Sequence, residues 1–349
     1  MTDRATTSKA TTSTTIRMSN DFTQYVKILG RGKKGARSLT LEEAEHAMSL
    51  MLSGNVAPEQ SGAFWMLIRI REETVEETVG FTKATRQYLL KKQPLGINID
   101  LDWPAYAGKR NELPWFLLAA LALANTGVNI VMHGHMFDGE NRMYVEHAIS
   151  KLGLVVCNSK GRLKHELETS HFAYMPLAEI DESLGAMMDL KYVLGLRSPV
   201  NTVVRMMNPF FANNSVHGVF HRGYDQLHLA ACEQLGDASV LVFRGGNGEA
   251  EVNPERDVTL GKWQDGMATW SDWPKAEKEH KRLKDNLDLS RLTDHWRGDQ
   301  LDQFGGQAVR QTVASVAGLL YGVSSHEECL VLADDIWARR DKGYFDSIL

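Results

Sequence analysis

The residues best placed for chemistry stand in two loops that follow predicted buried strands. The loop Ala105–Pro114 carries Lys109, Arg110 and a single glycine, and the turn His133–Asn141 follows the next strand. Ligands of open α/β sheets bind in the crevice at the carboxyl ends of the strands. We therefore expect both loops to line one cleft, which offers cations to an anion and lacks a glycine-rich phosphate cradle.

A second cationic segment precedes the first long helical pattern. It contains three glycines, no acid and five basic residues: Lys27, Arg31, Lys33, Lys34 and Arg37. Glycines permit close backbone approach, which suits a loop that contacts phosphates. The alternative is a solvated turn between helices, the common outcome for a run of charge.

Histidines offer a third kind of chemistry. His133 and His135, together with His217 or His221, could form a metal site. All four fall on predicted turns and strand ends, where polar residues that line a cleft are also ordinary.

Composition limits the possible partners and the compartment. The 349 residues are 43% hydrophobic and 24% charged, and the net charge of −5 means that only local clusters of cations could attract nucleic acid. Three cysteines without paired spacing favour a reducing compartment, so we expect a cytoplasmic protein. The longest apolar run, Trp115–Ala124, is half of the roughly 20 residues that a membrane span needs, so no membrane association is expected.

Strand and helix patterns alternate through most of the chain. Ile97–Trp103 predicts a strand, Trp115–Ala124 a helix buried on every face and Val128–Met132 a second strand, which together form a βαβ unit. The same alternation returns in Ser215–Phe220, Tyr224–Leu235 and Ser239–Phe243. The prediction is an α/β fold with a mostly parallel sheet flanked by helices.

A small all-α N-terminal domain precedes the sheet. Thr40 with Glu43 and Thr74 with Glu77 form two capping boxes, and Pro58 opens the helix between them. That middle helix is apolar at Phe64, Trp65, Met66, Leu67 and Ile68, more than a small bundle is expected to bury. A partner surface is therefore expected, which favours a homodimer.

The predicted domains follow from these patterns. Residues 1–20 are Ser/Thr-rich and predict a disordered tail. Residues 21–93, with about 177–208, form the helical dimerisation domain, and residues 94–176 and 209–349 form the α/β domain. The segment 257–306, which includes the charged run KEHKRLK, fits no element in this scheme.

Two stretches carry a family resemblance. SLTLEEAEHAMSLMLSGNVAPEQSGAFWMLIRIREETVEETVGFTKATR (Ser38–Arg86) and LGLRSPVNTVVRMMNP (Leu194–Pro209) resemble anthranilate phosphoribosyltransferases of glycosyl transferase family 3, and His133-Gly134 stands where that family has K-H-G-N. The resemblance implies a helical domain joined to a larger α/β domain and a homodimer through the helical domain. It also implies phosphoribosyl pyrophosphate and Mg²⁺ in the cleft between the domains.

Each phosphate-binding element of that family is altered in this sequence. The G-T-G-G-D-G cradle becomes AYAGKR, lysine becomes Met132, and the acidic pair that holds Mg²⁺ becomes Ala250-Glu251. The remaining degenerate phosphate site comprises Ala107, Gly108, Asn111, His133 and Gly134. One carboxylate, Glu251 or Glu249, could still contact Mg²⁺.

Two functions remain open from the sequence. The altered cradle with the basic loop resembles a divergent second group of the family, regarded as nucleic-acid binders. It implies non-specific binding of single-stranded DNA or RNA through basic loops, with candidate residues Arg31, Lys33, Lys34, Arg37, Lys109 and Arg110. The alternative is an active glycosyl or phosphoribosyl transferase with an altered substrate, which would use His133, Arg197 and Glu251 with Mg²⁺ and phosphoribosyl pyrophosphate. Arg197 stands where the family's acceptor-contacting arginine lies, although an ion pair that joins the domains would also explain it.

Overall fold

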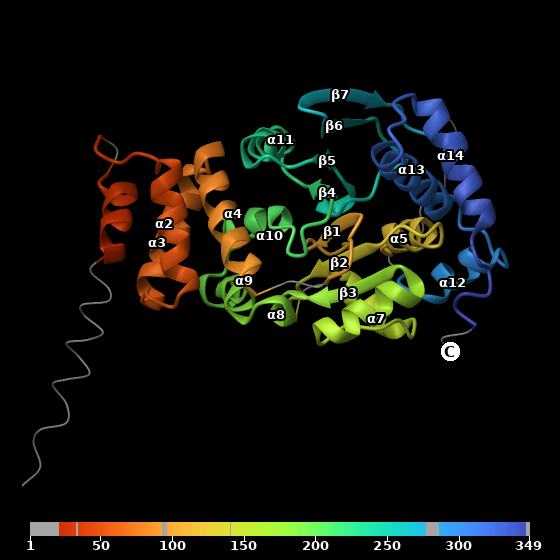
Figure 1. Ribbon diagram of the computed structural model, residues 1–349, viewed down its shortest axis with the longest axis horizontal. Helices are drawn as coiled ribbons and strands as arrows, with labels where there is room; N and C mark the ends of the chain where they lie inside the picture. Colours follow the sequence, from red (N-terminus) through yellow and green to blue (C-terminus); the bar gives the residue numbers. More distant parts are fainter. Residues whose placement is uncertain (1–20, 33, 93–95, 140, 277–285, 347–349) are drawn as a thin grey trace, which may run out of the picture. The chain divides into compact units, whose positions relative to one another are not determined.

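The computed structural model describes residues 21–32, 34–92, 96–139, 141–276 and 286–346. The predicted tail, Lys33 and the run KEHKRLK lie outside these described residues. The chain divides into two compact units (Figure 1): Met1–Lys92 with Ala186–Met207, and Gln93–Gly185 with Asn208–Leu349. The second segment of the helical unit thus begins at Ala186, where the sequence predicted about residue 177.

The helical unit is built from capped helices. After a helical segment at residues 21–30 come α2 (Leu41–Leu52), α3 (Pro58–Arg71) and α4 (Val75–Leu90). Both predicted capping boxes are present at the starts of α2 and α4, and Pro58 begins α3. The later segment adds most of α9 (Glu182–Leu194) and α10 (Val200–Met206).

The apolar surplus predicted for α3 is mostly buried within this unit. Phe64, Trp65 and Ile68 are fully buried. The Phe64 ring lies 5.2 Å from that of Phe22, and the Trp65 ring lies 5.2 Å from that of Phe81. The premise that these residues require a partner surface was therefore wrong. The apolar side chains that do reach solvent in this unit include Ile70, Leu90, Tyr192, Val193 and Leu196.

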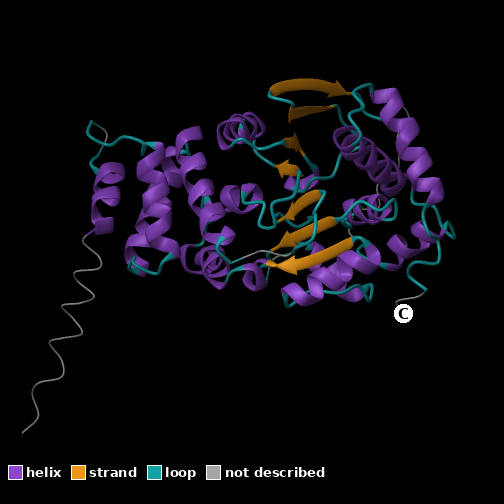
Figure 2. Cartoon of the chain, in the orientation of Figure 1, coloured by secondary structure: helices purple, strands orange, loops and turns teal. Residues whose placement is uncertain are grey.

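The second unit contains the predicted, mostly parallel sheet of seven strands, seen as one continuous stack in Figure 2. The strands β1 (Leu101–Ala105), β2 (Ile130–Gly134), β3 (Phe172–Pro176), β4 (Asn214–Val219) and β5 (Ser239–Arg244) are parallel, in the order β3-β2-β1-β4-β5. The chain reverses its direction of winding between β1 and β4. This topological switch point is where ligands of open sheets bind.

An antiparallel hairpin that the sequence analysis did not place extends the sheet beyond β5. Its strands are β6 (Val258–Gln264) and β7 (Met267–Trp273). Asp265 and Gly266 both have positive φ angles, +53° and +75°, at the turn that joins them. Two such residues form the two-residue turn whose twist matches paired strands.

Helices cover both faces of the sheet. α5 (Phe116–Ala124) is buried at every position, as predicted, and packs against α13 (Gln303–Leu320). α11 (Tyr224–Leu235) and α13 lie on opposite sides of the sheet (Figure 1). Further helices follow the remaining strands or close the unit: α6 (Val145–Lys151), α7 (Lys160–Ser170), α8 (Leu177–Ile180), η1 (Gly246–Gly248), α12 (Ser290–Arg297) and α14 (His326–Arg339). Among the described residues, no helix combines the length and apolarity needed to cross a bilayer.

The contact between α13 and the start of α5 yields a stability prediction. A Cβ at Gly305 would lie 2.4 Å from the Trp115 ring, whereas one at Gly161 in α7 would meet nothing within 4 Å. Gly305→Ala should therefore destabilise the sheet unit by about 1–3 kcal/mol through overpacking. Gly161→Ala, the matched control, should stabilise it by about 0.5–1 kcal/mol because alanine favours helix. Urea unfolding followed by tryptophan fluorescence measures both, and equal midpoints for the two variants would contradict this packing.

Candidate functional site

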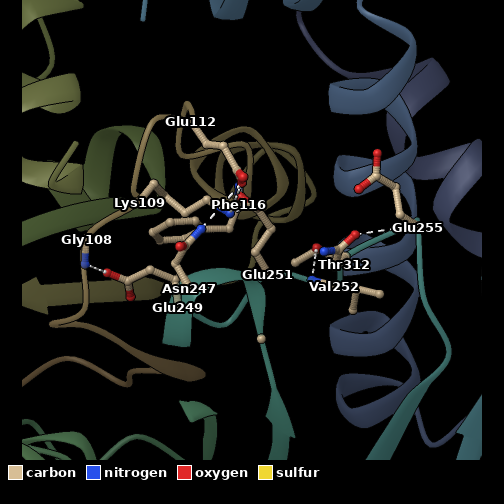
Figure 3. A network of polar contacts seen from close by, with 12 residues as sticks. Gly108, Lys109, Glu112, Phe116, Asn247, Glu249, Glu251, Val252, Glu255 and Thr312 are labelled. Carbon is tan, nitrogen blue, oxygen red and sulfur yellow. Dashed lines mark hydrogen bonds and ion pairs between the residues drawn. The ribbon is translucent and has the colours of Figure 1, made fainter. Parts of the chain in front are cut away.

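The loop after β1 is held by a carboxylate from the loop after β5. Oε1 of Glu249 accepts a hydrogen bond from the backbone amide of Ala107 at 2.8 Å. The same oxygen accepts one from the amide of Gly108 at 2.5 Å (Figure 3). Glu249 is almost fully buried. Two neighbouring amides aimed at one point form an anion-binding concavity. In this chain an internal carboxylate occupies that concavity.

A buried ion pair stands beside this contact. The ammonium of Lys109 binds Oε1 of Glu251, and Oε2 of Glu112 lies 3.3 Å from it. The other oxygen of Glu251 accepts the amide of Phe116, at 2.9 Å, at the start of α5. Lys109 is 1% exposed. The sequence placed Lys109 among cations that meet nucleic acid, and the structure instead places it in the interior as the counter-ion of Glu251.

The ion pair offsets the cost of burying Glu251. Burial raises the pKa of the Glu251 carboxyl, and the Lys109 ammonium and the Phe116 amide only partly counter this effect. A carboxyl with a raised pKa resists ionisation, so Glu251 relies on Lys109 for its charged form. Removal of Lys109 would leave the Glu251 carboxylate without its counter-ion in the interior, whereas removal of Glu251 would leave Lys109 with Glu112 alone.

The surrounding backbone fits closely around these side chains. A guanidinium nitrogen of Arg142 donates to the carbonyls of Ala107 and Gly108, at 3.1 and 3.0 Å. The backbone of Lys109 exchanges two hydrogen bonds with Met143, of 2.9 and 2.8 Å. At Gly246 a Cβ would lie only 2.6 Å from Nζ of Lys109. The backbone amides and carbonyls of Ala107, Gly108 and Lys109 therefore all form hydrogen bonds within the protein.

His133, the candidate catalytic histidine, lies in a buried chain of hydrogen bonds. Its Nε2 lies 2.9 Å from Oδ1 of Asp102, and its Nδ1 lies 2.6 Å from the Tyr106 hydroxyl. With a neutral ring, Nε2–H donates to the carboxylate and Nδ1 accepts from the hydroxyl. Gly134 follows at the end of β2, where a Cβ would lie 2.4 Å from the carbonyl oxygen of Ala105. His133 and Gly134 are therefore the last two residues of β2, where the sequence predicted the start of a turn, and both serve internal packing.

The remaining candidates of the sheet unit lie nearer to solvent. Arg110 is exposed, directly after the buried Lys109. Asn111 has a positive φ of +55°, and its side-chain oxygen accepts from Asn141 at 3.3 Å. Sequence reasoning missed three further arginines near this edge, Arg222, Arg244 and Arg256, which together with Arg110 line one pocket. Their only sequence signal was that each follows a predicted strand or its loop.

The basic loop belongs to the helical unit. Arg31 and Lys34 are exposed. Arg37 has a side chain that is 53% exposed, and its guanidinium binds both oxygens of Glu43, at 2.6 and 2.7 Å. Because Glu43 is also the capping-box residue of α2, Arg37 fixes the end of this loop to the helix.

Arg197, the candidate acceptor-side residue, is also in the helical unit. It is half-buried, and its carbonyl accepts from the guanidinium of Arg69. Burial, and then the charge of Arg197, lower the pKa of Lys191 to about 8. His133 and Glu251, the other residues of the alternative catalytic set, belong to the sheet unit.

The histidine and glutamate candidates do not come together as metal ligands among the described residues. In the part of the chain that the structure describes, no group of three or more histidine, cysteine or acidic side chains is arranged to hold a metal ion. His217 lies beside His228, with ring nitrogens 3.4 Å apart, and not in a cluster with His133.

Comparison with known proteins agrees with the fold. Residues 23–88 match the helical bundle domain of the glycosyl transferase family. The chain is 25% identical over 239 residues to the uncharacterized protein YbiB of Escherichia coli, covering 68% of this chain and 74% of YbiB. It is likewise 25% identical over 224 residues to the anthranilate phosphoribosyltransferase of Bacillus caldotenax, covering 64% and 92% of the two chains.

Solved structures extend the likeness over nearly the whole chain. The anthranilate phosphoribosyltransferase of Thermus thermophilus superposes with a TM-score of 0.73 and 20% identity, covering 93% of this chain and 96% of the enzyme. The Saccharomyces cerevisiae enzyme, solved in complex with PRPP and Mg, also has a TM-score of 0.73, with 17% identity and coverage of 95% and 99%. The fold is therefore that of a phosphoribosyltransferase of this class. In sequence, the chain is similar to anthranilate phosphoribosyltransferases and, over residues 23–88, to the helical bundle domain of the glycosyl transferase family, as the sequence resemblance indicated.

The buried pair yields a thermodynamic prediction. Lys109→Met should destabilise the sheet unit by about 3–5 kcal/mol, because it leaves Glu251 buried without its counter-ion. Glu251→Gln should destabilise it less, because the Glu112 carboxylate remains 3.3 Å from the Lys109 ammonium. The double variant should cost clearly less than the sum, since neither charge remains. Urea unfolding of the four proteins gives the coupling energy. Arg110→Ala, one residue away and exposed, is the matched control and should change stability by no more than about 0.5 kcal/mol. Additive single effects would refute the pairing.

Proposed function

We propose that this protein is a non-catalytic member of its fold class that binds single-stranded DNA or RNA without sequence specificity, through its exposed basic residues. Its phosphoribosyl pyrophosphate and Mg²⁺ site is degenerate. Binding would rest on contacts between lysine or arginine and phosphates, because no nucleic-acid recognition motif was found in the sequence.

The observation that carries the proposal is the contact of Glu249 with the amides of Ala107 and Gly108. By the family resemblance, these amides belong to the cradle that receives pyrophosphate. A phosphate entering there would have to displace a buried carboxylate, and the two anions repel each other. This arrangement supports loss of the original substrate.

The carboxylate that would have to bind Mg²⁺ is also occupied by contacts within the protein. Glu251 contributes one oxygen to Lys109 and the other to the Phe116 amide, and its predecessor, Ala250, has no carboxylate. An ammonium therefore stands next to the acid that a divalent cation would need. The donor set therefore does not fit a magnesium ion.

Exposed lysines and arginines are the residues through which the protein would bind nucleic acid. Arg31 and Lys34 in the helical unit, and Arg110 and Arg222 in the sheet unit, reach solvent. Each is able to contact a phosphate without the desolvation that a buried charge requires. Clusters of this kind can bind nucleic acid even though the net charge of the chain is −5.

We also propose that the helical unit forms a homodimer. Ile70 and Val193 are 81% and 83% exposed, and Leu196 is 49% exposed. Ile70 lies in the last turn of α3. In the same helix, a Cβ at Gly62 would lie 3.6 Å from the side chain of Leu194 in α9, so the two helices are close to each other. Exposed apolar residues on neighbouring helices suit a self-complementary interface.

The degenerate site predicts an absence of transfer activity. With anthranilate, phosphoribosyl pyrophosphate and excess Mg²⁺, the protein should give no more product than a Glu251→Gln control, because the cradle and the metal site are internally occupied. A fluorescence assay of the anthranilate product measures this. Turnover that exceeds the control would place the transferase alternative first.

Nucleic-acid binding predicts a steep dependence on salt. Each neutralised phosphate of a single strand contributes a log–log slope of about −0.7, so a few contacts in each subunit of a dimer give a slope of several units. Replacing Arg31, Lys33, Lys34 and Arg37 by alanine should weaken binding to all sequences alike and flatten the slope. Fluorescence anisotropy of labelled oligonucleotides at several salt concentrations measures both quantities.

A matched control removes the same number of charges elsewhere. Lys83, Arg162, Lys164 and Arg339 are surface cations that each pair with an acid, and their fourfold alanine variant should keep most of the slope. If the loop variant bound like the parent protein at every salt concentration, the basic loop would not be the contact surface.

A further inference from the structure

An arginine-lined pocket opens at the carboxyl ends of three parallel strands. Its lining comes from the loops after β1, β4 and β5, all within the sheet unit, and its volume is about 610 Å³. Pockets of 300–1,000 Å³ are typical of small-molecule sites. The lining residues are Arg110, Asn111, Glu112, Phe220, His221, Arg222, Arg244, Gly245, Gly246, Asn247, Asn253 and Arg256.

The charge of this lining is strongly positive. It contains four arginines and one acid, Glu112, whose carboxylate lies 3.3 Å from Lys109. Three asparagines add neutral donors and acceptors. Arginine is the side chain best suited to phosphate, because its planar fork of donors matches two phosphate oxygens at once.

Two of the arginines are held together. Nη2 of Arg256 donates to the carbonyls of Arg244 and Gly245, at 3.0 and 3.3 Å. Burial, and then the charge of Arg244, lower the pKa of Arg256. The Nε of Arg244 is buried and has no hydrogen-bond partner among the described residues. The proximity of the Arg244 and Arg256 charges and the unpaired Nε–H of Arg244 are both unfavourable. A bound anion would offset both costs, because it would neutralise the charges and accept the hydrogen bond.

The rim of the pocket carries an exposed aromatic side chain. Phe220, directly after β4, is 61% exposed, and its ring meets that of His221 edge-on at 5.1 Å. Below it, Gly248 has a φ of +92°, and a Cβ there would lie 3.1 Å from Cβ of Phe220. An exposed aromatic face next to cationic groups is the usual platform for a nucleic-acid base.

We infer that this pocket binds the phosphomonoester at an end of a single-stranded nucleic acid, with Phe220 stacking on the terminal base. The inference rests on the proposed function and adds a preference for phosphorylated ends to non-specific binding. Sequence specificity is not required, because every base has a face on which Phe220 can stack.

Charge favours an end over an internal position. A phosphomonoester carries about −1.5 to −2 at pH 7, whereas a phosphodiester carries one negative charge. Four converging arginines match the larger charge. The pocket is also large enough for a whole terminal nucleotide.

The test compares short single strands that differ only at their ends. Oligonucleotides with a 5′-phosphate, a 3′-phosphate or only hydroxyl ends are titrated against the full-length protein by fluorescence anisotropy at fixed salt. At least one phosphorylated end should bind about tenfold or more tightly than the hydroxyl form, in line with hydrogen bonds to a charged group. Equal affinity of all three would overturn the inference.

Variants locate the preference. Arg244→Ala and Arg256→Ala should each reduce the ratio of affinities for phosphorylated and hydroxyl ends toward one. Arg339→Ala removes the same charge from α14, outside the pocket, and should leave that ratio unchanged. Phe220→Ala should weaken binding of terminal nucleotides but not of inorganic phosphate, each measured as a competitor. A preference that survived both pocket substitutions would refute the assignment.

Two further ligands separate this inference from the proposed function. A circular single strand has no ends, so its binding tests non-specific binding alone. If the circle binds and phosphorylated ends show no advantage, only the terminal site fails. If the circle fails to bind, the proposed function fails. A mononucleotide that bound as tightly as the phosphorylated strand would identify the pocket as a nucleotide site and would contradict a nucleic-acid ligand.

Discussion

The organisation of the site depends on one interaction: the carboxylate of Glu249 accepts hydrogen bonds from two backbone amides of the loop after β1. Once that anion is bound internally, the amides of Ala107 and Gly108 are satisfied, and the loop no longer needs a phosphate to complete it. In the same way, the Lys109 ammonium lies beside Glu251, where we propose that a metal ion would otherwise bind. In the proposed account, a carboxylate and an ammonium of the chain itself provide the charges that a phosphate and a metal ion would otherwise bring.

This internal pairing moves the positive potential to other residues. Lys109 is buried beside Glu251, so the cations that line the pocket at this edge of the sheet are its neighbour Arg110 with Arg222, Arg244 and Arg256. The topology concentrates them, since parallel strands on both sides of the switch point end at one edge of the sheet. A chain with a net charge of −5 can in this way present a local cluster of arginines to an anion.

Sequence reasoning predicted what is encoded locally and missed what depends on distant partners. The capping boxes, the fully buried α5 and the alternating strands and helices have local patterns, and the structure confirms them. The hairpin of β6 and β7 also had a local signal, the Asp265-Gly266 turn, which was not used. The burial of Lys109 had none, because Glu251 is 142 residues away in the chain. A lysine beside an arginine resembles a surface pair until the fold brings a carboxylate to it.

The most direct test of internal occupation is calorimetric titration of the protein with phosphoribosyl pyrophosphate, with and without Mg²⁺. An anthranilate phosphoribosyltransferase serves as the positive control in the same buffer. Because Glu249 and Lys109 already fill the cradle and the cation position, addition of Mg²⁺ should produce no saturable binding to this protein at ligand concentrations that saturate the control. Saturable binding that requires Mg²⁺ would contradict the account, since it would mean that the internal carboxylate and ammonium give way to the substrate.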